Sequence, residues 1–305
     1  MPVPVPPLPP LPPRSATEIV DGAVQLIRPH FGYFLRIAAI GAIPGLIQSV
    51  VSLILFPTTS IDPVAVLRQQ ATLLPLSLLA YAFATVQSGA IIGGALALLR
   101  GEQLPTVWAA FTSAFRRVFA LLGANLLLGL ILMIIALPVI AVVAFLGVAT
   151  GVSLSAFGNS GVAGAIGAVL AAIAILVVVL VVSLSVFARS AVMTALVVVE
   201  KLGPIEALRR SQELSRGNYL LLAKTYGLVI VVFGVVYLVL AGVLAALQDK
   251  QQIAQALVSV LTIPVAPIIG SIMLLTYADL RVRREGADLD AVLDTMPDPT
   301  QFSPT

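Results

Sequence analysis

The chain has 305 residues and a formal net charge of +3; 59% of its residues are hydrophobic and 10% are charged. A soluble domain carries about 25% charged residues, so this composition excludes an ordinary water-soluble globule and a disordered chain. The lack of Cys excludes disulfides and thiolate metal sites, and one His cannot form a histidine cluster. The small positive excess does not indicate nucleic-acid binding. We therefore expect an all-α polytopic membrane protein without a cofactor, a metal ion or a nucleic-acid partner.

The N-terminal segment is rich in proline and reads MPVPVPPLPPLPPR. Proline prevents an apolar helix, and the segment lacks an early basic region, so it does not have the pattern of a signal peptide. We expect residues 1–14 to form an extended, polyproline-II-like disordered tail. A ligand for a proline-binding protein is the alternative, and the sequence identifies no such partner.

Six stretches contain the run of about 20 mostly apolar residues that a helix needs to cross the hydrocarbon core of a bilayer. The predicted spans are Tyr33–Phe56, Ala71–Leu99, Val118–Gly147, Val162–Phe187, Tyr219–Leu247 and Ile253–Ala278. Together they predict a six-helix transmembrane domain over residues 15–286, followed by a disordered cytoplasmic tail over residues 287–305.

Basic residues are distributed unevenly between the two sides that six spans would define. Only Arg68 and Lys250, of the 17 Lys and Arg residues, would lie on the side opposite the termini. Basic loops are retained in the cytoplasm. We therefore expect a multi-pass protein of the inner (cytoplasmic) membrane with both termini in the cytoplasm.

Three short amphipathic segments precede the first, third and fifth predicted spans. They are Ser15–Arg28, Thr106–Arg117 and Pro204–Arg216, and we expect each to form a helix at the cytoplasmic interface. Each segment contains an Arg that is followed three residues later by an aromatic residue and then by a span. This pattern predicts a threefold repeat that starts near residues 15, 104 and 204. Coincidence is the alternative, because spans that enter from the cytoplasm tend to begin with such residues.

Two further expectations concern the third segment and the chain before it. The spacing of Glu206 and Arg210, and that of Arg209 and Glu213, predicts two i,i+4 ion pairs. The apolar run Ser190–Val199, which follows the fourth span, is too short to cross the membrane again. It either extends the fourth helix into the cytoplasmic interface or lies along that interface, and the sequence does not distinguish the two.

Groups that carry chemistry are scarce within the predicted spans, none of which contains Asp or Glu. Proton pumps and ion-coupled transporters keep ionisable groups at membrane depth, so this composition disfavours proton-coupled transport and an intramembrane enzyme. Gln87 and Asn125 are the polar side chains at depth that best fit an intramembrane polar site. Interhelical hydrogen bonds, worth about 0.6 kcal/mol each on average, are the alternative explanation for them.

Basic residues on the cytoplasmic side are the candidates for contact with lipid headgroups. They are Arg28, Arg116, Arg209, Arg210, Arg216, Arg281, Arg283 and Arg284. Each basic residue near an anionic membrane surface contributes about 1 kcal/mol of attraction. The alternative is that these residues set the topology and are otherwise solvated, with Glu200, Glu206 and Asp279 as partners that organise this side.

Several motifs resemble those of a known family. The segments Glu206-Ala-Leu-Arg-Arg-Ser211 with Arg216-Gly-Asn218, Tyr277-Ala-Asp-Leu-Arg281, and Ser15 to Gly22 resemble bacterial membrane proteins grouped with the membrane domain of glycerophosphodiester phosphodiesterases. The resemblance covers roughly residues 13–290. In enzymes of that family, a separate soluble barrel with metal-binding acids and histidines carries the chemistry. The resemblance therefore implies a membrane module without the hydrolase, because this chain has no room for the barrel and only one His.

These observations predict a non-catalytic membrane module, either a scaffold or a lipid-associated factor, with membrane lipids as its partners. The sequence names no protein partner. The alternative is a transporter or permease for an apolar or amphiphilic solute, with a path lined by Gln87, Asn125 and the helix break at Pro264–Pro267.

Overall fold

A computed structural model describes residues 13–56, 63–131, 133–134, 137, 170, 174, 190, 192–246, 257–258 and 260–286. The described residues form helices joined by short connections and contain no strand, which confirms the all-α class. Apart from isolated positions, the predicted fourth span lies outside the described residues. Nearly all of the predicted proline-rich tail and the whole predicted C-terminal tail lie outside them as well.

The three short amphipathic segments are helices, as predicted. They are α1 (Ala16–Ile27), α4 (Val107–Phe115) and α8 (Pro204–Ser215). Each is followed, after a break, by a long apolar helix. The break between α4 and the helix Val118–Ile131 turns the chain by 69°. The chain therefore repeats one local arrangement three times, a short helix and then a long one, and a true threefold repeat stays a prediction.

Local capping explains where the short helices begin. The Ser15 hydroxyl accepts from the Glu18 N–H (3.4 Å), and the Glu18 carboxylate accepts from the Ser15 N–H (2.6 Å), which completes a capping box. The Thr106 hydroxyl accepts from the Ala109 N–H at 3.2 Å. Helix α8 starts at Pro204, whose missing N–H costs nothing in a first turn.

The long helices are α2 (Phe31–Leu55), α3 (Pro63–Leu99), α9 (Tyr219–Ala246) and α11 (Val265–Glu285). Within the described ranges, four helices are long and apolar enough to cross a membrane, or five if α4 and Val118–Ile131 count as one bent span. The prediction of six spans is therefore not confirmed, whereas a membrane-embedded helical protein is.

Helix α11 lies further along the chain than the predicted sixth span. It begins at Val265 because Pro264 precedes it as the N-cap residue. It continues to Glu285, beyond the predicted end, because ion pairs one turn apart join Asp279 to Arg283 and Arg281 to Glu285. It ends at a left-handed Gly286 (φ 61°), the usual residue at a helix C-terminus.

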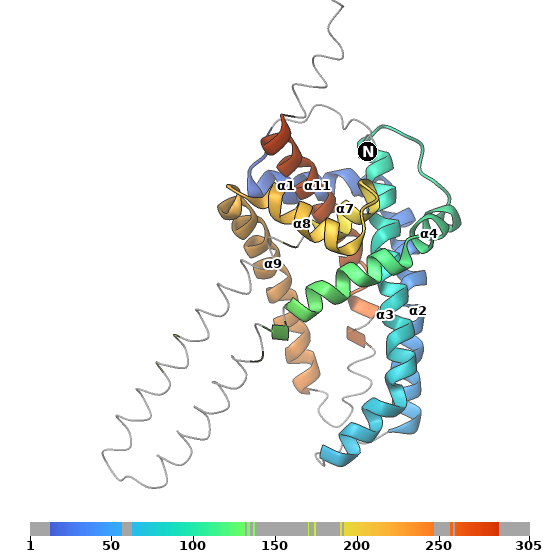
Figure 1. Cartoon of the computed structure of the whole chain (residues 1–305). Helices are drawn as coiled ribbons and strands as arrows, with labels where there is room; N and C mark the ends of the chain where they lie inside the picture. Colours follow the sequence, from blue (N-terminus) through green and yellow to red (C-terminus); the bar gives the residue numbers. More distant parts are fainter. Residues whose placement is uncertain are drawn as a thin grey trace, which may run out of the picture.

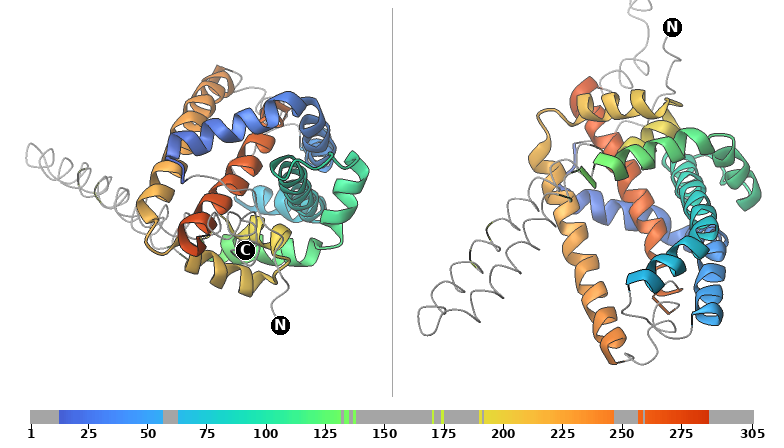
Figure 2. Two further views of the ribbon diagram at one scale, coloured as in Figure 1. Left: turned by 90° about the horizontal axis from the view of Figure 1, so that it is seen from above. Right: turned by 60° about the horizontal axis from the view of Figure 1, so that its bottom comes forward.

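The short helices gather at one end of the molecule, and α2, α3 and α9 run from there to the opposite end (Figure 1). Seen from the first end, α1, α4, α8 and α9 lie around α11, which occupies the centre (Figure 2, left). Helix α1 packs against α11 and α9, and α3 packs against α2, α4 and α11. The molecule is thus a bundle of long helices whose one end is surrounded by short ones.

Small residues let the long helices approach closely. A Cβ on Gly41 of α2 would lie 2.1 Å from Gln87 Oε1 of α3, and a Cβ on Gly270 of α11 would lie 2.6 Å from Ile91 of α3. Gly89 of α3 similarly faces Leu121. Close backbone approach through small residues is the usual mode of packing between membrane helices.

The apolar run after the predicted fourth span is packed inside the protein. It contains the short helix α7 (Met193–Val199), which packs against α3, α8 and α11. Met193, Leu196 and Val197 are at most 1% exposed. Helix α7 is therefore part of the protein core, next to the short helices (Figure 1).

Candidate functional site: the charged end

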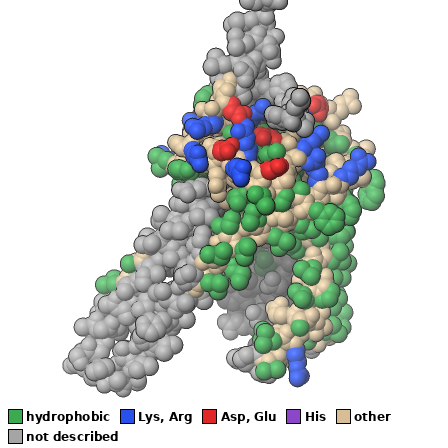
Figure 3. Space-filling model, viewed as in Figure 1, with side chains coloured by type: hydrophobic (Ala, Val, Ile, Leu, Met, Phe, Trp, Pro, Cys, Tyr) green, Lys and Arg blue, Asp and Glu red, His purple; other side chains and the backbone are tan. Residues whose placement is uncertain are grey.

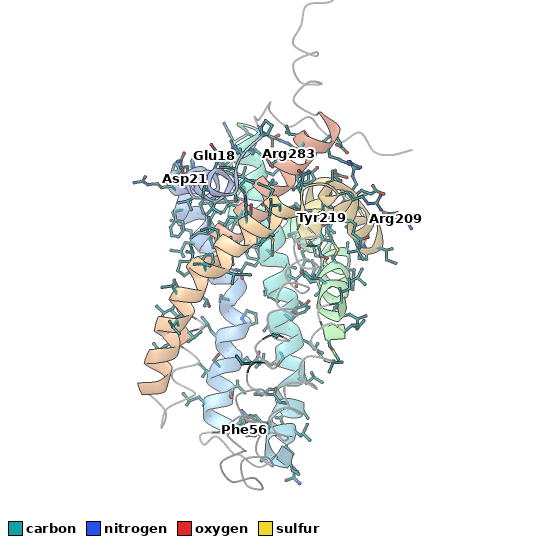
Figure 4. The ribbon with its side chains drawn as sticks, turned by 90° about the vertical axis from the view of Figure 1, so that its left-hand side faces the viewer. Glu18, Asp21, Phe56, Arg209, Tyr219 and Arg283 are labelled. Carbon is teal, nitrogen blue, oxygen red and sulfur yellow. The ribbon has the colours of Figure 1, made fainter. Side chains whose placement is uncertain are left out.

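Charged side chains gather at the end of the molecule that carries α1, α8 and the C-terminal part of α11, and hydrophobic side chains cover the visible face below it (Figure 3). Glu18, Arg209 and Arg283 lie at this end, whereas Phe56, which follows α2, lies at the other (Figure 4). We call this region the charged end. Arg68 is in the N-terminal part of α3, at the opposite end of the molecule (Figure 1).

A buried carboxylate ties the N-terminal segment to the last described helix. The Asp279 carboxylate accepts from the Arg14 N–H (2.6 Å) and from Arg283 Nε (2.7 Å), and its side chain is 2% exposed. Arg283 also donates to the Arg14 carbonyl at 2.7 Å. We call Arg14, Asp279 and Arg283 the terminal clasp. Close packing supports it, since Gly22 of α1 faces both Arg14 and Leu275 of α11.

A second network joins the end of α7, helix α8 and helix α11 through Arg210. Its guanidinium pairs with Glu200 (3.4 Å), with Glu213 (3.8 Å) and with Glu285. Burial alone would lower the pKa of Arg210, but the charges of Glu200, Glu285 and Glu213 outweigh it and raise that pKa above its ordinary value. Arg210 therefore stays protonated, and carboxylates of the same chain occupy its guanidinium group.

The Arg210 network extends along α11. The Tyr277 hydroxyl donates to Glu200 Oε1 at 2.9 Å, and Arg281 Nε donates to Glu285 Oε2 at 3.1 Å. Glu200 and Asp279 are therefore bound to basic partners, as predicted for the organisation of this side. Glu206 is not: it accepts from the Gly203 N–H (3.2 Å) at the start of α8, so its expected pairing with Arg210 is wrong.

The predicted headgroup candidates thus divide into two groups. Arg210, Arg281 and Arg283 are held by carboxylates of the same chain. The exposed group consists of Arg28, Arg116, Arg209, Arg216 and Arg284. Among the described residues, none of this second group takes part in an ion pair. Of the eight predicted candidates, these five therefore have guanidinium charge available for an external anion.

Arg116 belongs to a groove that the sequence analysis did not single out. The groove is open, has a volume of about 640 Å³ and includes Arg117 and Lys201 in its lining. Ser113, Phe119, Ala120, Leu202 and Gly203 complete the lining. The sequence gives no signal for it, because Lys201 is far from Arg117 along the chain and stands out in no local pattern.

Exposed aromatic side chains mark the border between the charged end and the apolar helices. Trp108 and Phe115 of α4 are 80% and 61% exposed, and Phe119 is 87% exposed. Tyr219, at the start of α9, is also exposed (Figure 4). Aromatic residues favour this position at the level of lipid headgroups.

No hydrogen bond among the described residues joins the two amides predicted at membrane depth. Gln87 packs onto Gly41 of α2 and is 9% exposed. Gly89, on the opposite side of α3, faces the helix that contains Asn125, which is half-buried. Helix packing accounts for the position of Gln87 without a bound solute.

Within the described residues, no group of three or more His, Asp or Glu side chains is placed to hold a metal ion. Comparison with known proteins provides no further identification, since no family model matches the chain and no curated protein or solved structure matches it.

Proposed function

We propose that this chain is a non-catalytic integral membrane module, a scaffold or lipid-associated factor, that binds anionic lipid headgroups through its charged end. The observation that carries the proposal is the concentration at that end of exposed arginines that form no ion pair with another described residue, next to a border of exposed aromatic residues. We further propose that the membrane is a cytoplasmic membrane and that the charged end faces the cytoplasm, because basic segments are retained there.

The remaining surface supports a location in lipid. Three large apolar side chains, Ile54 of α2, Leu67 of α3 and Leu238 of α9, are 69–74% exposed. All three lie on helices that are long enough to span a bilayer. Apolar exposure on this scale is unfavourable in water and favourable against acyl chains. The charged end then lies at the level of the headgroups, where each basic residue contributes about 1 kcal/mol of attraction to an anionic surface.

The family resemblance is part of the same proposal. Tyr277, Asp279 and Arg281 of one motif and Arg210 of another all belong to the terminal clasp or the Arg210 network. These residues stabilise the fold of the charged end, and a membrane module needs that stabilisation with or without an attached hydrolase. This supports a module whose motifs maintain structure rather than perform hydrolysis.

The test measures enrichment of anionic lipid around the full-length protein. The protein is reconstituted into phosphatidylcholine vesicles with a minor fraction of spin-labelled phosphatidylglycerol, and the motionally restricted lipid is quantified by electron paramagnetic resonance. We expect the double variant Arg209→Gln/Arg216→Gln to reduce enrichment, because both side chains are exposed and unpaired. Arg68→Gln, at the opposite end, is the matched control and leaves enrichment unchanged. Equal enrichment in all three proteins would refute the proposal.

Transport of an apolar or amphiphilic solute is the second candidate, and no contact among the described residues favours it. Gln87 is occupied by helix packing, and Pro264 serves as the N-cap residue of α11. Uptake of a fluorescent amphiphile into liposomes containing the protein tests this candidate, and saturable uptake would favour transport.

A further inference from the structure

The groove lined by Arg116, Arg117 and Lys201 differs from the rest of the charged end in its charge balance. Arg210 and Arg283 have carboxylate partners within 4 Å, whereas no ion pair among the described residues includes any of the three groove cations. No Asp or Glu lines the groove. Three positive charges therefore share one open concave surface without an ion-pair partner among the described residues.

Packing holds the walls of the groove in place. One wall is the turn where α4 ends at Phe115 and the helix Val118–Ile131 begins, bent by 69°. The other wall is the connection from α7 to α8, which carries Lys201 and Gly203. The walls meet where Pro204 lies against Gly123, at 3.0 Å from the position of an added Cβ. The three cations therefore come from two segments that are packed together: Arg116 and Arg117 from one, and Lys201 from the other.

Lys201 occupies a backbone conformation that disfavours its own residue type. Its φ is 60°, and it is the only non-glycine residue with positive φ in the part of the chain that the structure describes. Glycine adopts this conformation without the steric conflict that a Cβ introduces. A lysine here sacrifices backbone stability and places an ammonium group in the groove lining, and such strain is concentrated at sites of function.

The groove also has an apolar part. Phe119 and Ala120 line the groove and lie in the first turn of the apolar helix Val118–Ile131. The Phe119 side chain is 87% exposed. A ligand that satisfies both parts has an anionic group next to a hydrocarbon chain. A phospholipid has this arrangement, whereas a soluble phosphate has only the first part.

We propose that this groove binds the phosphate group of an anionic phospholipid, with Arg116, Arg117 and Lys201 contacting its oxygens and Phe119 contacting an acyl chain. Guanidinium groups match phosphate oxygens in a two-pronged geometry, and a lysine ammonium contributes a compact charge. The inference rests on the proposed function and deepens it, because it selects one site within the charged end. Glu206, the nearby carboxylate, is turned to the Gly203 N–H at 3.2 Å.

The experiment counts lipid molecules that stay bound to the full-length protein during detergent purification. Native mass spectrometry of the protein, titrated with phosphatidylglycerol, gives the affinity of each bound lipid. Lys201→Gly is the central variant, because it removes the ammonium group and relieves the backbone strain. We expect about a fivefold weaker first binding step, the factor for one basic residue near an anionic surface, with a melting temperature that does not fall.

Further variants separate the parts of the site. Arg116→Gln/Arg117→Gln reduces the first binding step by roughly 25-fold if two such contributions combine. Phe119→Ala weakens binding of long-chain phosphatidylglycerol but not of a short-chain analogue. The matched control is Arg209→Gln/Arg216→Gln, which removes two exposed cations outside the groove and leaves the first step unchanged.

Each alternative outcome overturns a defined part of the inference. Unchanged first-step binding in Lys201→Gly, or an equal loss in Arg209→Gln/Arg216→Gln, overturns the groove site. The proposed function, binding of anionic lipid by the charged end as a whole, would still stand if Arg209→Gln/Arg216→Gln lowered the enrichment of spin-labelled phosphatidylglycerol. Displacement of the lipid by millimolar inorganic phosphate or glycerol phosphate identifies a soluble phosphate as the ligand and overturns the lipid assignment. The lipid assignment is supported if neither compound competes.

Discussion

Removal of the buried Asp279 carboxylate tests how much the terminal clasp contributes to the free energy of unfolding. Asp279 accepts two hydrogen bonds, from the Arg14 N–H and from Arg283 Nε, and is 2% exposed. A hydrogen bond that involves a charged group contributes about 1.5–3 kcal/mol. Arg283 is 29% exposed and regains water when its partner is lost, so the lower end of the range applies. We expect Asp279→Ala to lower the free energy of unfolding by roughly 2–4 kcal/mol.

Circular dichroism of the full-length protein in one detergent, followed during heating, measures the effect as a lower melting temperature. Glu213→Ala is the matched control: it also removes a carboxylate from the charged end, but one that is 47% exposed and 3.8 Å from its partner. An exposed pair of this kind contributes about 0–1 kcal/mol. If Asp279→Ala and Glu213→Ala melted at the same temperature, the clasp would not stabilise the fold and this reasoning would be wrong.

Three further predictions follow from contacts described above. Gly41→Ala brings a Cβ into the amide packed beneath it (2.1 Å), so we expect a loss of about 1–3 kcal/mol from overpacking; Gly45→Ala, which meets open space on the same helix, is the control, and equal melting temperatures would contradict the packing. Tyr277→Phe removes one hydrogen bond to the Arg210 network and lowers stability by about 1 kcal/mol, measured by the same melting experiment; no change would show that this bond adds nothing. Because the chain has no cysteine, Gln103→Cys and Val64→Cys report topology directly, and an impermeant maleimide is expected to label them from opposite sides of the membrane; labelling from one side would overturn the proposed orientation.

The three short helices were predictable because their signals are local. Ser15 and Glu18 form the capping box that their spacing predicts, and Pro204 occupies the first turn of α8. Such signals depend on atoms within one helical turn, so they do not depend on the tertiary contacts of the rest of the chain. The asymmetric distribution of basic residues likewise appears as one charged end (Figure 3).

Features that depend on distant contacts were not predictable. Helix α7 is apolar except for Thr194, so its sequence does not distinguish a protein interior from a lipid interface; its packing against α3, α8 and α11 places it in the interior. Glu206 caps the Gly203 N–H at the start of α8, whereas Arg210 pairs with Glu200 and Glu285, both outside α8, and those distant partners could not be read from the sequence of α8.

The candidate groove shows the same limit. Arg116 was selected for its place before a span and Arg117 is its neighbour in the sequence, but Lys201 joins them through the packing of Pro204 against Gly123. The positive φ of Lys201 is a property of the folded backbone, and the neighbouring sequence does not predict it. The sequence shows which residues are basic, but it does not show that Arg116, Arg117 and Lys201 meet in one groove.

The terminal clasp also sets an order for biosynthesis. Its two ends are 265 residues apart, and a ribosome that adds about 5–20 residues per second needs roughly 13–53 s to travel between them. Throughout that interval α1 has no α11 to cover Ile19 and Ala23, which are fully buried in the finished protein. A nascent chain that stops before α11 leaves this face of α1 uncovered, so the burial of α1 is completed only when α11 has been made.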